Sequence, residues 1–515
     1  MKPSDNSGPA ETQTPAALLP CGEADSVANP TLQTVAAPAN LLWAWQRVQR
    51  NRGAPGIDGV NIGAFDHDLD ARLDIIARNI RSGRYRPSPL RAVERPKEDL
   101  SGSRTLHIPT VQDRAVLQAI AQVLTPVWEP HFSPSSFAYR EGRSALDAVL
   151  LAQQRLETGQ HWIVDLDIEK FFDNVGHIRL MQRLAQRVED VGLLDLIADF
   201  LRCPVQSDRG LRPTRVGLAQ GSPLSPLLAN IVLDELDQEY ASHGWSFVRY
   251  SDDCILLARS EAEAGARLEF TREFLADRLQ LHLNPLKTRI VQPSEVGFLG
   301  FSYRLSRYGH VQRQITKNAL AAFRRKITDL AQPKKGKPLE DTFLAVAEYF
   351  RGWTNYFSFT QDNVLLAARS YACDALRAAA WLHWATPPER YRQLVRLGLC
   401  EATAEKAAFT LDFPGPEDDP PVLRRLLPDS LFERYGLRIQ RPLRRPLSAH
   451  PLAQVLGAAP AEGQSTQAQD PHSEQSKPRP APSRLPAERE RAAIFRYLGT
   501  RLRVRPPPIW PPFPS

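Results

Sequence analysis

The chain has 515 residues, of which 42% are hydrophobic, and this supplies enough apolar side chain for a large buried core and several domains. Its net charge of +7 favours a polyanionic partner, although many proteins that bind none are equally basic. The five cysteines include no Cys-x-x-Cys pair, which argues against a zinc site, and no apolar run or signal pattern indicates a membrane, so we expect a cytoplasmic protein.

The N-terminal part of the chain divides into a low-complexity segment and a basic, structured segment. Residues 1–38 are rich in Ala, Pro, Thr and Ser without an aromatic side chain, so we expect disorder there. An amphipathic helix with a basic face is predicted over residues 41–52, followed by a glycine-containing turn over residues 52–60. A basic strand pair follows between residues 85 and 118, although scattered charge of this kind is usually a solvated face.

Two strand-like runs in the middle of the chain end in carboxylates. The run at residues 162–166 leads into Asp167, and the run that begins at residue 247 leads into Asp252 and Asp253 at the predicted turn of a hairpin. An isolated Asp-Asp pair is usually a solvated turn, but two acidic sites of this kind can meet at one edge of a sheet. Divalent ions would relieve their repulsion, and two such ions can clamp the attacking and leaving oxygens of a phosphoryl transfer. Mg²⁺ suits these oxygen ligands, with Mn²⁺ as the alternative ion.

The remaining segments are predicted turns and helices. Residues 217–230 are typical of a turn followed by an apolar helix, and the Gln220-Gly221 step in it permits close approach of the backbone to a nucleotide. Residues 304–337 carry ten basic side chains against one acid, which predicts phosphate binding that weakens with salt. Helical spacing continues to about residue 408, and the sequence beyond about residue 413 is rich in Pro and Arg.

These blocks together resemble the bacterial reverse transcriptases of the group II intron type. Tyr250-Ser251-Asp252-Asp253 resembles the Tyr-x-Asp-Asp box of reverse transcriptases, and residues 167–172 resemble their first catalytic motif. The order and spacing of further blocks match the intron-type members, at residues 56–59, 217–230, 281–288, 298–301 and 349–357. Ala219 and Ser251 depart from the family, which usually has Pro and Ala there; these changes leave the chemistry intact but weaken assignment to a particular lineage.

The resemblance implies roles for individual residues around the reaction. Asp167, Asp252 and Asp253 would be the catalytic and metal-binding carboxylates. The nucleotide-binding residues would be Lys97 and Arg104 at the triphosphate, Phe172 beneath the sugar, Gln220 at the base or sugar, and Lys287 at a phosphate or the catalytic centre. For Phe172 a core aromatic is the alternative, with Phe171 as the expected core residue, and for Lys287 the alternative is a solvated lysine.

Contacts with nucleic acid are implied for a second set of residues. These are Arg140, Arg143, Gly300, Arg324, Arg325, Arg351 and Trp353. The block around Arg140 and Arg143 fits a capped helix start equally well, and most aromatic side chains near Trp353 would pack helices together rather than stack on RNA.

The fold implied by the resemblance is α+β. It is a right-hand polymerase with fingers and palm, built from an antiparallel sheet and helices, followed by an α-helical thumb of the maturase type. The expected parts are a disordered segment at residues 1–38, an N-terminal extension with fingers at 39–160, a palm at 161–303, a basic helical thumb at 304–412, and a largely disordered tail at 413–515.

The implied function is that of an RNA-directed DNA polymerase. It would extend a DNA or RNA primer with dNTPs on an RNA template, using two Mg²⁺ ions, and in the intron setting it would act on its own intron RNA. Two alternatives stay open: a domesticated relative that works with a CRISPR integrase or in anti-phage defence, and an RNA-binding splicing cofactor with a vestigial polymerase. The intact Asp167, Asp252 and Asp253 argue against the cofactor. The sequence identifies neither the RNA nor the oligomeric state.

Overall fold

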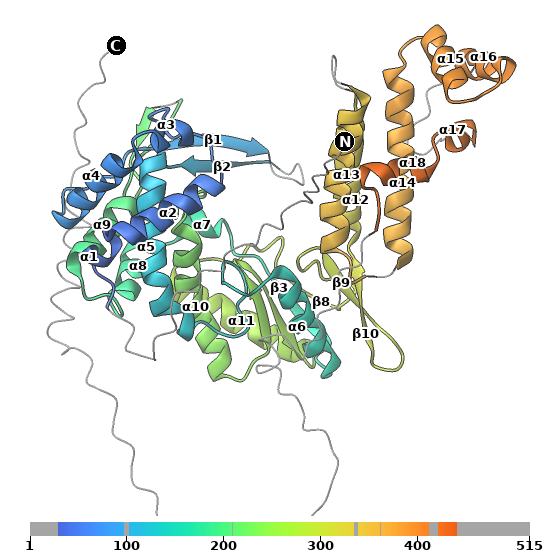
Figure 1. Ribbon diagram of the computed structural model, residues 1–515. Helices are drawn as coiled ribbons and strands as arrows, with labels where there is room; N and C mark the ends of the chain where they lie inside the picture. The colour runs from blue at the N-terminus through green and yellow to red at the C-terminus, as the bar shows by residue number, and fades with distance from the viewer. Residues whose placement is uncertain are drawn as a thin grey trace, which may run out of the picture.

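The computed structural model of the chain describes residues 29–96, 102–208, 210–333, 338–360, 362–410 and 421–439. Three sheets and many helices run through these residues, which confirms the predicted α+β fold. The N-terminal and central elements gather in one lobe, and a hairpin connects them to a second, helical lobe (Figure 1). No helix among the described residues is both long and apolar enough to cross a membrane. The expectations for residues 1–28, Lys97 and residues 440–515 lie outside the described residues.

The N-terminal helices pack against one long helix, α5 (Val111–Trp128), or against one another. They are α1 (Leu32–Val35), α2 (Pro38–Arg50), α3 (Ile62–Asp66) and α4 (Leu69–Arg81). The segment predicted to be disordered, residues 1–38, was drawn too long, because α1 lies within it. Val35 is fully buried, and the Leu32 N–H donates to the Asp190 carboxylate at 2.8 Å. A buried side chain and a distant hydrogen bond therefore order this segment despite its composition.

The fingers contain a four-stranded sheet in the order β2-β1-β4-β5. Its strands are β1 (Leu90–Pro96), β2 (Ser103–Ile108), β4 (Val205–Ser207) and β5 (Gly210–Arg212). The predicted basic strand pair is confirmed as the antiparallel pair β1–β2, in which Arg95 lies opposite Arg104.

The palm sheet has the order β6-β7-β3-β8, with every neighbouring pair antiparallel. Its strands are β3 (Trp162–Leu166), β6 (Phe247–Tyr250), β7 (Asp253–Ala258) and β8 (Arg289–Val291). Alternate side chains of β3 face different cores: Ile163 shares a cluster with helix α6 (Ala145–Glu157), and Val164 shares one with α10 (Ser225–Ser242) and α11 (Glu261–Phe274). Because strand side chains alternate, Asp165 and Asp167 lie on the Ile163 face.

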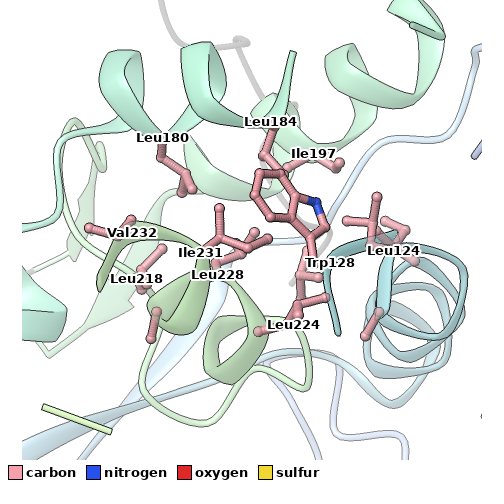
Figure 2. Packing of buried hydrophobic residues seen from close by; sticks show 14 of the residues in the cluster. Leu124, Trp128, Leu180, Leu184, Ile197, Leu218, Leu224, Leu228, Ile231 and Val232 are labelled. Carbon is pink, nitrogen blue, oxygen red and sulfur yellow. The ribbon is translucent and has the colours of Figure 1, made fainter. Parts of the chain in front are cut away.

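A tryptophan at the end of α5 is at the centre of the core beneath fingers and palm (Figure 2). Trp128 is fully buried. Its neighbours in the cluster include Leu180 and Leu184 of α8 (His177–Leu184), Ile197 of α9 (Val191–Leu201), and Leu228 and Ile231 of α10. Leu218, from the loop before α10, belongs to the same cluster. Since burial of a leucine side chain is worth about 1.5–3 kcal/mol, this loop is anchored to the core.

Short elements complete the palm and lead to the thumb. They are η1 (Glu129–His131), α7 (Phe171–Asn174), the π-helical turn η2 (Leu275–Leu279), and the hairpin of β9 (Phe301–Leu305) and β10 (Val311–Ile315). The predicted helical thumb follows as α12 (Lys317–Ala331), α13 (Leu339–Tyr356), α14 (Asp362–His383), α15 (Pro387–Arg396) and α16 (Glu401–Thr410).

The thumb extends beyond the boundary predicted at residue 412. Helices α17 (Pro421–Leu426) and α18 (Asp429–Tyr435) fall in the segment expected to be a disordered tail. Phe432 is fully buried with its ring 5.4 Å from that of Phe343 on α13, and Arg377 of α14 donates to the Asp429 carboxylate at 2.5 Å. The composition of this segment did not predict these two helices, because a few apolar side chains and one ion pair are enough to dock short helices on the thumb.

Candidate active site

The acidic turn lies between β6 and β7, which pair as far as Tyr250 and Asp253. Ser251 and Asp252 therefore form a two-residue turn, as the sequence predicts for this hairpin. Ser251 has φ +63°, a region that residues other than glycine rarely occupy. Its carbonyl oxygen accepts a hydrogen bond from Arg249 Nη1 at 3.0 Å, which holds the turn in this conformation.

Strand β3 brings two further carboxylates to the same end of the sheet. Leu166, the last residue of β3, pairs with Cys254, so Asp167, which follows the strand, lies beside the start of β7. Four acidic side chains line one open cavity of about 490 Å³: Asp165, Asp167, Asp252 and Asp253. The structure therefore brings the three predicted carboxylates together and adds Asp165 to them.

The negative charge in this cavity is only partly balanced by cations. Burial, followed by the carboxylates of Asp165 and Asp252, raises the pKa of Asp253 to about 7. Burial also raises the pKa of Asp165, against the opposing effect of Arg289, whose guanidinium lies 3.4 Å from the Asp165 carboxylate. A nearby divalent cation favours the charged form of such carboxylates and removes their mutual repulsion.

The loop that carries Lys287 is attached to the end of β3. The Asn284 N–H donates to the Asp167 carbonyl oxygen at 2.8 Å, and Lys287 Nζ lies 3.1 Å from Asp167 Oδ2. The side chains of this ion pair are 62% and 37% exposed, so solvent screens it. Lys287 thus lies within the acidic cavity, beside one of its carboxylates.

The donor chemistry of the cavity fits a hard divalent cation, because its polar lining is dominated by carboxylate oxygens. Within the described part of the chain, no three acidic, His or Cys side chains already surround a common point. Asp167 is paired with Lys287 instead. An ion bound between β3 and the acidic turn would therefore compete with this lysine for the Asp167 carboxylate.

The loop before α10 packs directly against the first catalytic motif. The Leu218 N–H donates to the Phe172 carbonyl oxygen at 2.6 Å. Gly217 has φ +94°, and a Cβ added there would lie 2.9 Å from a backbone oxygen of α7, so only glycine fits this approach. The Gln220 carbonyl oxygen accepts the His107 N–H of β2 at 2.8 Å, which ties this loop to the fingers.

Phe172 and Gln220, two of the residues predicted to bind the nucleotide, lie on neighbouring segments of this region. Phe171 is buried, which confirms it as a core residue, and Phe172 is only partly buried, with its ring 5.3 Å from that of Phe171. Gln220 is also partly exposed, and its amide lies 3.5 Å from the Asp173 carboxylate next to Phe172. Arg104 is exposed on β2.

A groove leads from the acidic cavity to the thumb. It has a volume of about 1010 Å³ and is lined by Gly300 before β9 and Arg325 of α12. Arg289, Gly297 and Asn318 line both this groove and the acidic cavity, so the two are continuous. The wall of the groove is basic where it passes Arg289 and Arg325.

Three of the predicted nucleic-acid contacts are exposed on the thumb helices. Arg324 and Arg325 lie on the surface of α12, and the Arg324 guanidinium lies 5.4 Å from the centre of the Tyr371 ring. Arg351 is exposed on α13. These positions leave all three side chains accessible to a phosphate.

Three other predicted contacts are held by the protein itself. Arg140 donates to the Glu129 carboxylate at 2.8 Å and to two backbone carbonyls, and Arg143 donates to the Pro134 carbonyl at 2.7 Å. The alternative of a capped helix start is confirmed by the reciprocal hydrogen bonds of Ser144 and Asp147 at α6.

Trp353 is the third of these contacts. It is 9% exposed, with its ring 4.3 Å from that of Phe323. RNA contact by Trp353 would require this ring packing to open. Contact by Arg140 would require its hydrogen bonds to Glu129 and the backbone to break.

Two charged residues of the cavity, Asp165 and Arg289, were not predicted as site residues. Asp165 precedes Asp167 by two residues, and this spacing on a strand is the signal that places both side chains on one face. Arg289 reaches the cavity only because β8 pairs with β3, with Arg289 opposite Asp165. No pattern in the sequence predicts the pairing of β8 with β3.

Comparison with known proteins places two family models on the chain. Residues 95–303 match the model for reverse transcriptase (RNA-dependent DNA polymerase), and residues 320–398 match the model for the maturase-specific domain of group II introns. The first match covers the strands and loops that form the acidic cavity, and the second covers most of the thumb.

Individual proteins are also similar to the chain. It is 31% identical to protein YkfC of Escherichia coli K12 over 326 residues, which cover 55% of this chain and 85% of YkfC. It is 26% identical over 335 residues to the group II intron-encoded protein LtrA of Lactococcus lactis subsp. cremoris, covering 52% of this chain and only 56% of LtrA. A solved partial Cas6-RT-Cas1–Cas2 complex is similar over 48% of this chain and 42% of that chain, at 25% identity and a TM-score of 0.32.

Proposed function

Because the chain belongs to the family of group II intron-type reverse transcriptases and maturases, we propose that it is an RNA-directed DNA polymerase. It would extend the 3′-hydroxyl of a primer with dNTPs on an RNA template. The observation that carries the proposal is the acidic cavity at the ends of β3 and the β6–β7 hairpin, which continues into a basic groove beside the thumb.

The metal-binding residues in this proposal are Asp167, Asp252 and Asp253. They would hold two Mg²⁺ ions, with Mn²⁺ as a substitute. When bound, such ions activate the attacking hydroxyl and stabilise the leaving pyrophosphate. Asp165 keeps its ion pair with Arg289. Lys287, released from Asp167, would be free to approach a phosphate of the nucleotide.

The nucleotide would bind between the fingers and the loop before α10. Lys97 and Arg104 would contact the triphosphate, because its oxygens require cationic hydrogen-bond donors in addition to metal. Phe172 would lie beneath the sugar and exclude a 2′-hydroxyl, and Gln220 would contact the base or the sugar. The hydrogen bond between Leu218 and Phe172 supports this arrangement, because it fixes the two segments relative to each other.

The primer and template would follow the groove from the acidic cavity to the thumb. Arg289 and Arg325 line this path, and Gly300 lets the backbone approach it closely. Arg324 and Arg351 would add phosphate contacts outside the groove. Because the contacts are largely ionic, we expect affinity for a primer–template duplex to fall steeply with salt.

Primer extension tests the proposal directly. We expect Mg²⁺-dependent dNTP incorporation on an annealed RNA template, with loss to background in the Asp252→Ala/Asp253→Ala variant. Asp277→Ala is the matched control, because Asp277 is an exposed acid of η2 outside the cavity, and it should retain activity. Absence of incorporation by folded wild-type protein on several templates, or full activity in the double variant, would contradict the proposal.

The match of residues 320–398 to the maturase-specific domain favours a second candidate function, binding of intron RNA as a splicing cofactor. One variant can distinguish the polymerase function from the splicing-cofactor function. If Asp252→Ala/Asp253→Ala loses incorporation but keeps wild-type affinity for a group II intron RNA and supports its splicing, the cofactor function exists beside the polymerase. Equal affinity for an unrelated folded RNA of the same length would argue against it.

A further inference from the structure

A strained turn connects the thumb to the acidic cavity. Leu299 has φ +52° and Gly300 has φ +81°, so two successive residues lie in the left-handed region. Leucine is disfavoured there because its Cβ crowds the following carbonyl oxygen. Such a conformation persists only where the surrounding structure holds it.

Contacts from the thumb hold this turn on its outer side. The Tyr356 hydroxyl, at the end of α13, donates to the Leu299 carbonyl oxygen at 3.0 Å. The Gly300 carbonyl oxygen accepts the N–H of Thr316, the cap of α12, at 3.0 Å. A Cβ added to Gly300 would lie 3.1 Å from the Phe357 ring, so thumb and turn are in close contact.

The other side of the same turn faces a catalytic carboxylate. Gly297, two residues before Leu299, lines the acidic cavity together with Asp253. The backbone N–H of Leu299 favours the ionised form of the Asp253 carboxylate and lowers its pKa, against the larger effect of burial. Leu299 therefore lies between the two parts: its N–H acts on Asp253 in the acidic cavity, and its C=O accepts from the thumb. Displacement of the Leu299 peptide by loss of the Tyr356 hydrogen bond would move the donor away from Asp253.

We propose that Tyr356 is a positioning residue that orients the Asp253 carboxylate for metal binding through the Leu299 backbone. The inference rests on the proposed polymerase function and deepens it, since it couples docking of the thumb to the metal site. Tyr356 touches neither substrate nor metal in this role.

The side chain of Tyr356 is suited to a hydrogen-bonding role in addition to packing. Burial, followed by the nearby Tyr250 and Asp253, raises its pKa to about 12, so the phenol stays protonated and remains a donor at neutral pH. Its ring also packs 5.7 Å from Phe301 and 4.8 Å from Phe357. The packing would survive replacement by phenylalanine, and only the hydrogen bond would be lost.

The test compares Tyr356→Phe with Tyr303→Phe. Tyr303 is a matched control because its buried hydroxyl donates to the Val149 carbonyl oxygen at 3.1 Å, the same kind of bond, but to α6 instead of the Leu299 carbonyl oxygen. Three properties are measured for each protein: Mn²⁺ affinity from the free-ion signal in electron paramagnetic resonance, the single-turnover incorporation rate with its nucleotide dependence, and the melting temperature.

For Tyr356→Phe we expect weaker Mn²⁺ binding and a lower maximal incorporation rate, each by roughly three- to tenfold, the range that follows from loss of one hydrogen bond. Primer–template affinity and the apparent nucleotide affinity should stay near wild type. Tyr303→Phe should leave the Mn²⁺ affinity and the maximal incorporation rate unchanged. Its loss of melting temperature should be similar to that of Tyr356→Phe.

Two outcomes would overturn the positioning role. One is wild-type Mn²⁺ affinity and rate in Tyr356→Phe, and the other is an equal loss in both variants, which would indicate general destabilisation. If the wild-type protein incorporates no nucleotide, the proposed function fails, while the Mn²⁺ titration still tests whether Tyr356 supports Asp253.

Discussion

Arg249 and Asp237 form an ion pair that is closed off from solvent directly behind the acidic turn. Two hydrogen bonds join the guanidinium to the carboxylate, at 2.8 and 2.5 Å, and the two side chains are 1% and 0% exposed. The same guanidinium donates to Asn230 on α10 and to the Ser251 carbonyl oxygen, each at 3.0 Å. Helix α10 thereby supports the turn that carries Asp252 and Asp253.

The first prediction concerns this pair. Arg249→Met leaves the Asp237 carboxylate buried and unpaired, and we expect a loss of unfolding free energy of about 3–5 kcal/mol. The double variant Arg249→Met/Asp237→Leu removes both charges and should recover most of that loss in urea unfolding. Its nucleotide incorporation should stay low, because the Ser251 carbonyl oxygen still lacks its donor. A double variant as active as wild type would show that the turn does not need Arg249.

The second prediction separates backbone conformation from close packing at Gly300. Gly300 and Gly309 have nearly the same φ, +81° and +79°, but a Cβ on Gly309 meets nothing within 4 Å, whereas on Gly300 it meets Phe357 at 3.1 Å. Gly309→Ala should therefore cost about 1–2 kcal/mol, the usual cost of the left-handed conformation. Gly300→Ala should cost more and also weaken primer–template binding. Equal costs in thermal unfolding would mean that Phe357 yields to the added methyl group.

The strands and loops of the site follow from local patterns, and for that reason the sequence predicts them well. Apolar runs that end in acids specify β3 and the β6–β7 hairpin, and the Tyr250–Asp253 turn lies where the pattern places it. The alternation of side chains along β3 also determines which face Asp167 occupies.

The contacts that support the site depend on long-range packing and leave no local pattern. Tyr356 meets Leu299 across 57 positions of sequence, and nothing in either segment specifies that meeting. Arg140 has the residue type of a phosphate contact, yet the Glu129 carboxylate and nearby carbonyls take up its hydrogen bonds. The direction of a side chain, which decides between these roles, is determined only when the helices and strands pack.

The third prediction concerns competition for Asp167. In Lys287→Gln the carboxylate loses its ion pair, which is largely exposed and therefore worth about 0.2–1 kcal/mol. We expect little change in melting temperature and roughly two- to fivefold tighter Mn²⁺ binding, because the lysine no longer competes with the metal. Incorporation should nevertheless slow, since the proposed phosphate contact is lost. Weaker Mn²⁺ binding in the variant would contradict the competition.

The last prediction is a pH dependence that arises in the fingers, away from the acidic cavity. Asp113 is 1% exposed near the start of α5, where it accepts hydrogen bonds from the Tyr85 hydroxyl, the Thr110 hydroxyl and the Ser88 N–H. Burial raises its pKa from 3.8 to about 6, although these hydrogen bonds oppose the shift. The folded protein therefore holds this proton more tightly than the unfolded chain.

The sign of the effect follows from linkage. Between pH 4 and 6 the folded state binds more protons at Asp113 than the unfolded state, so its contribution to stability is present at low pH and is lost as pH rises through 6. A shift of about two pKa units corresponds to a change on the order of 3 kcal/mol. Urea unfolding of Asp113→Asn should lack this part of the pH slope, whereas Asp74→Asn, at an exposed position on α4, should keep it. An unchanged slope in Asp113→Asn would show that the three hydrogen bonds outweigh burial and keep the carboxylate ionised.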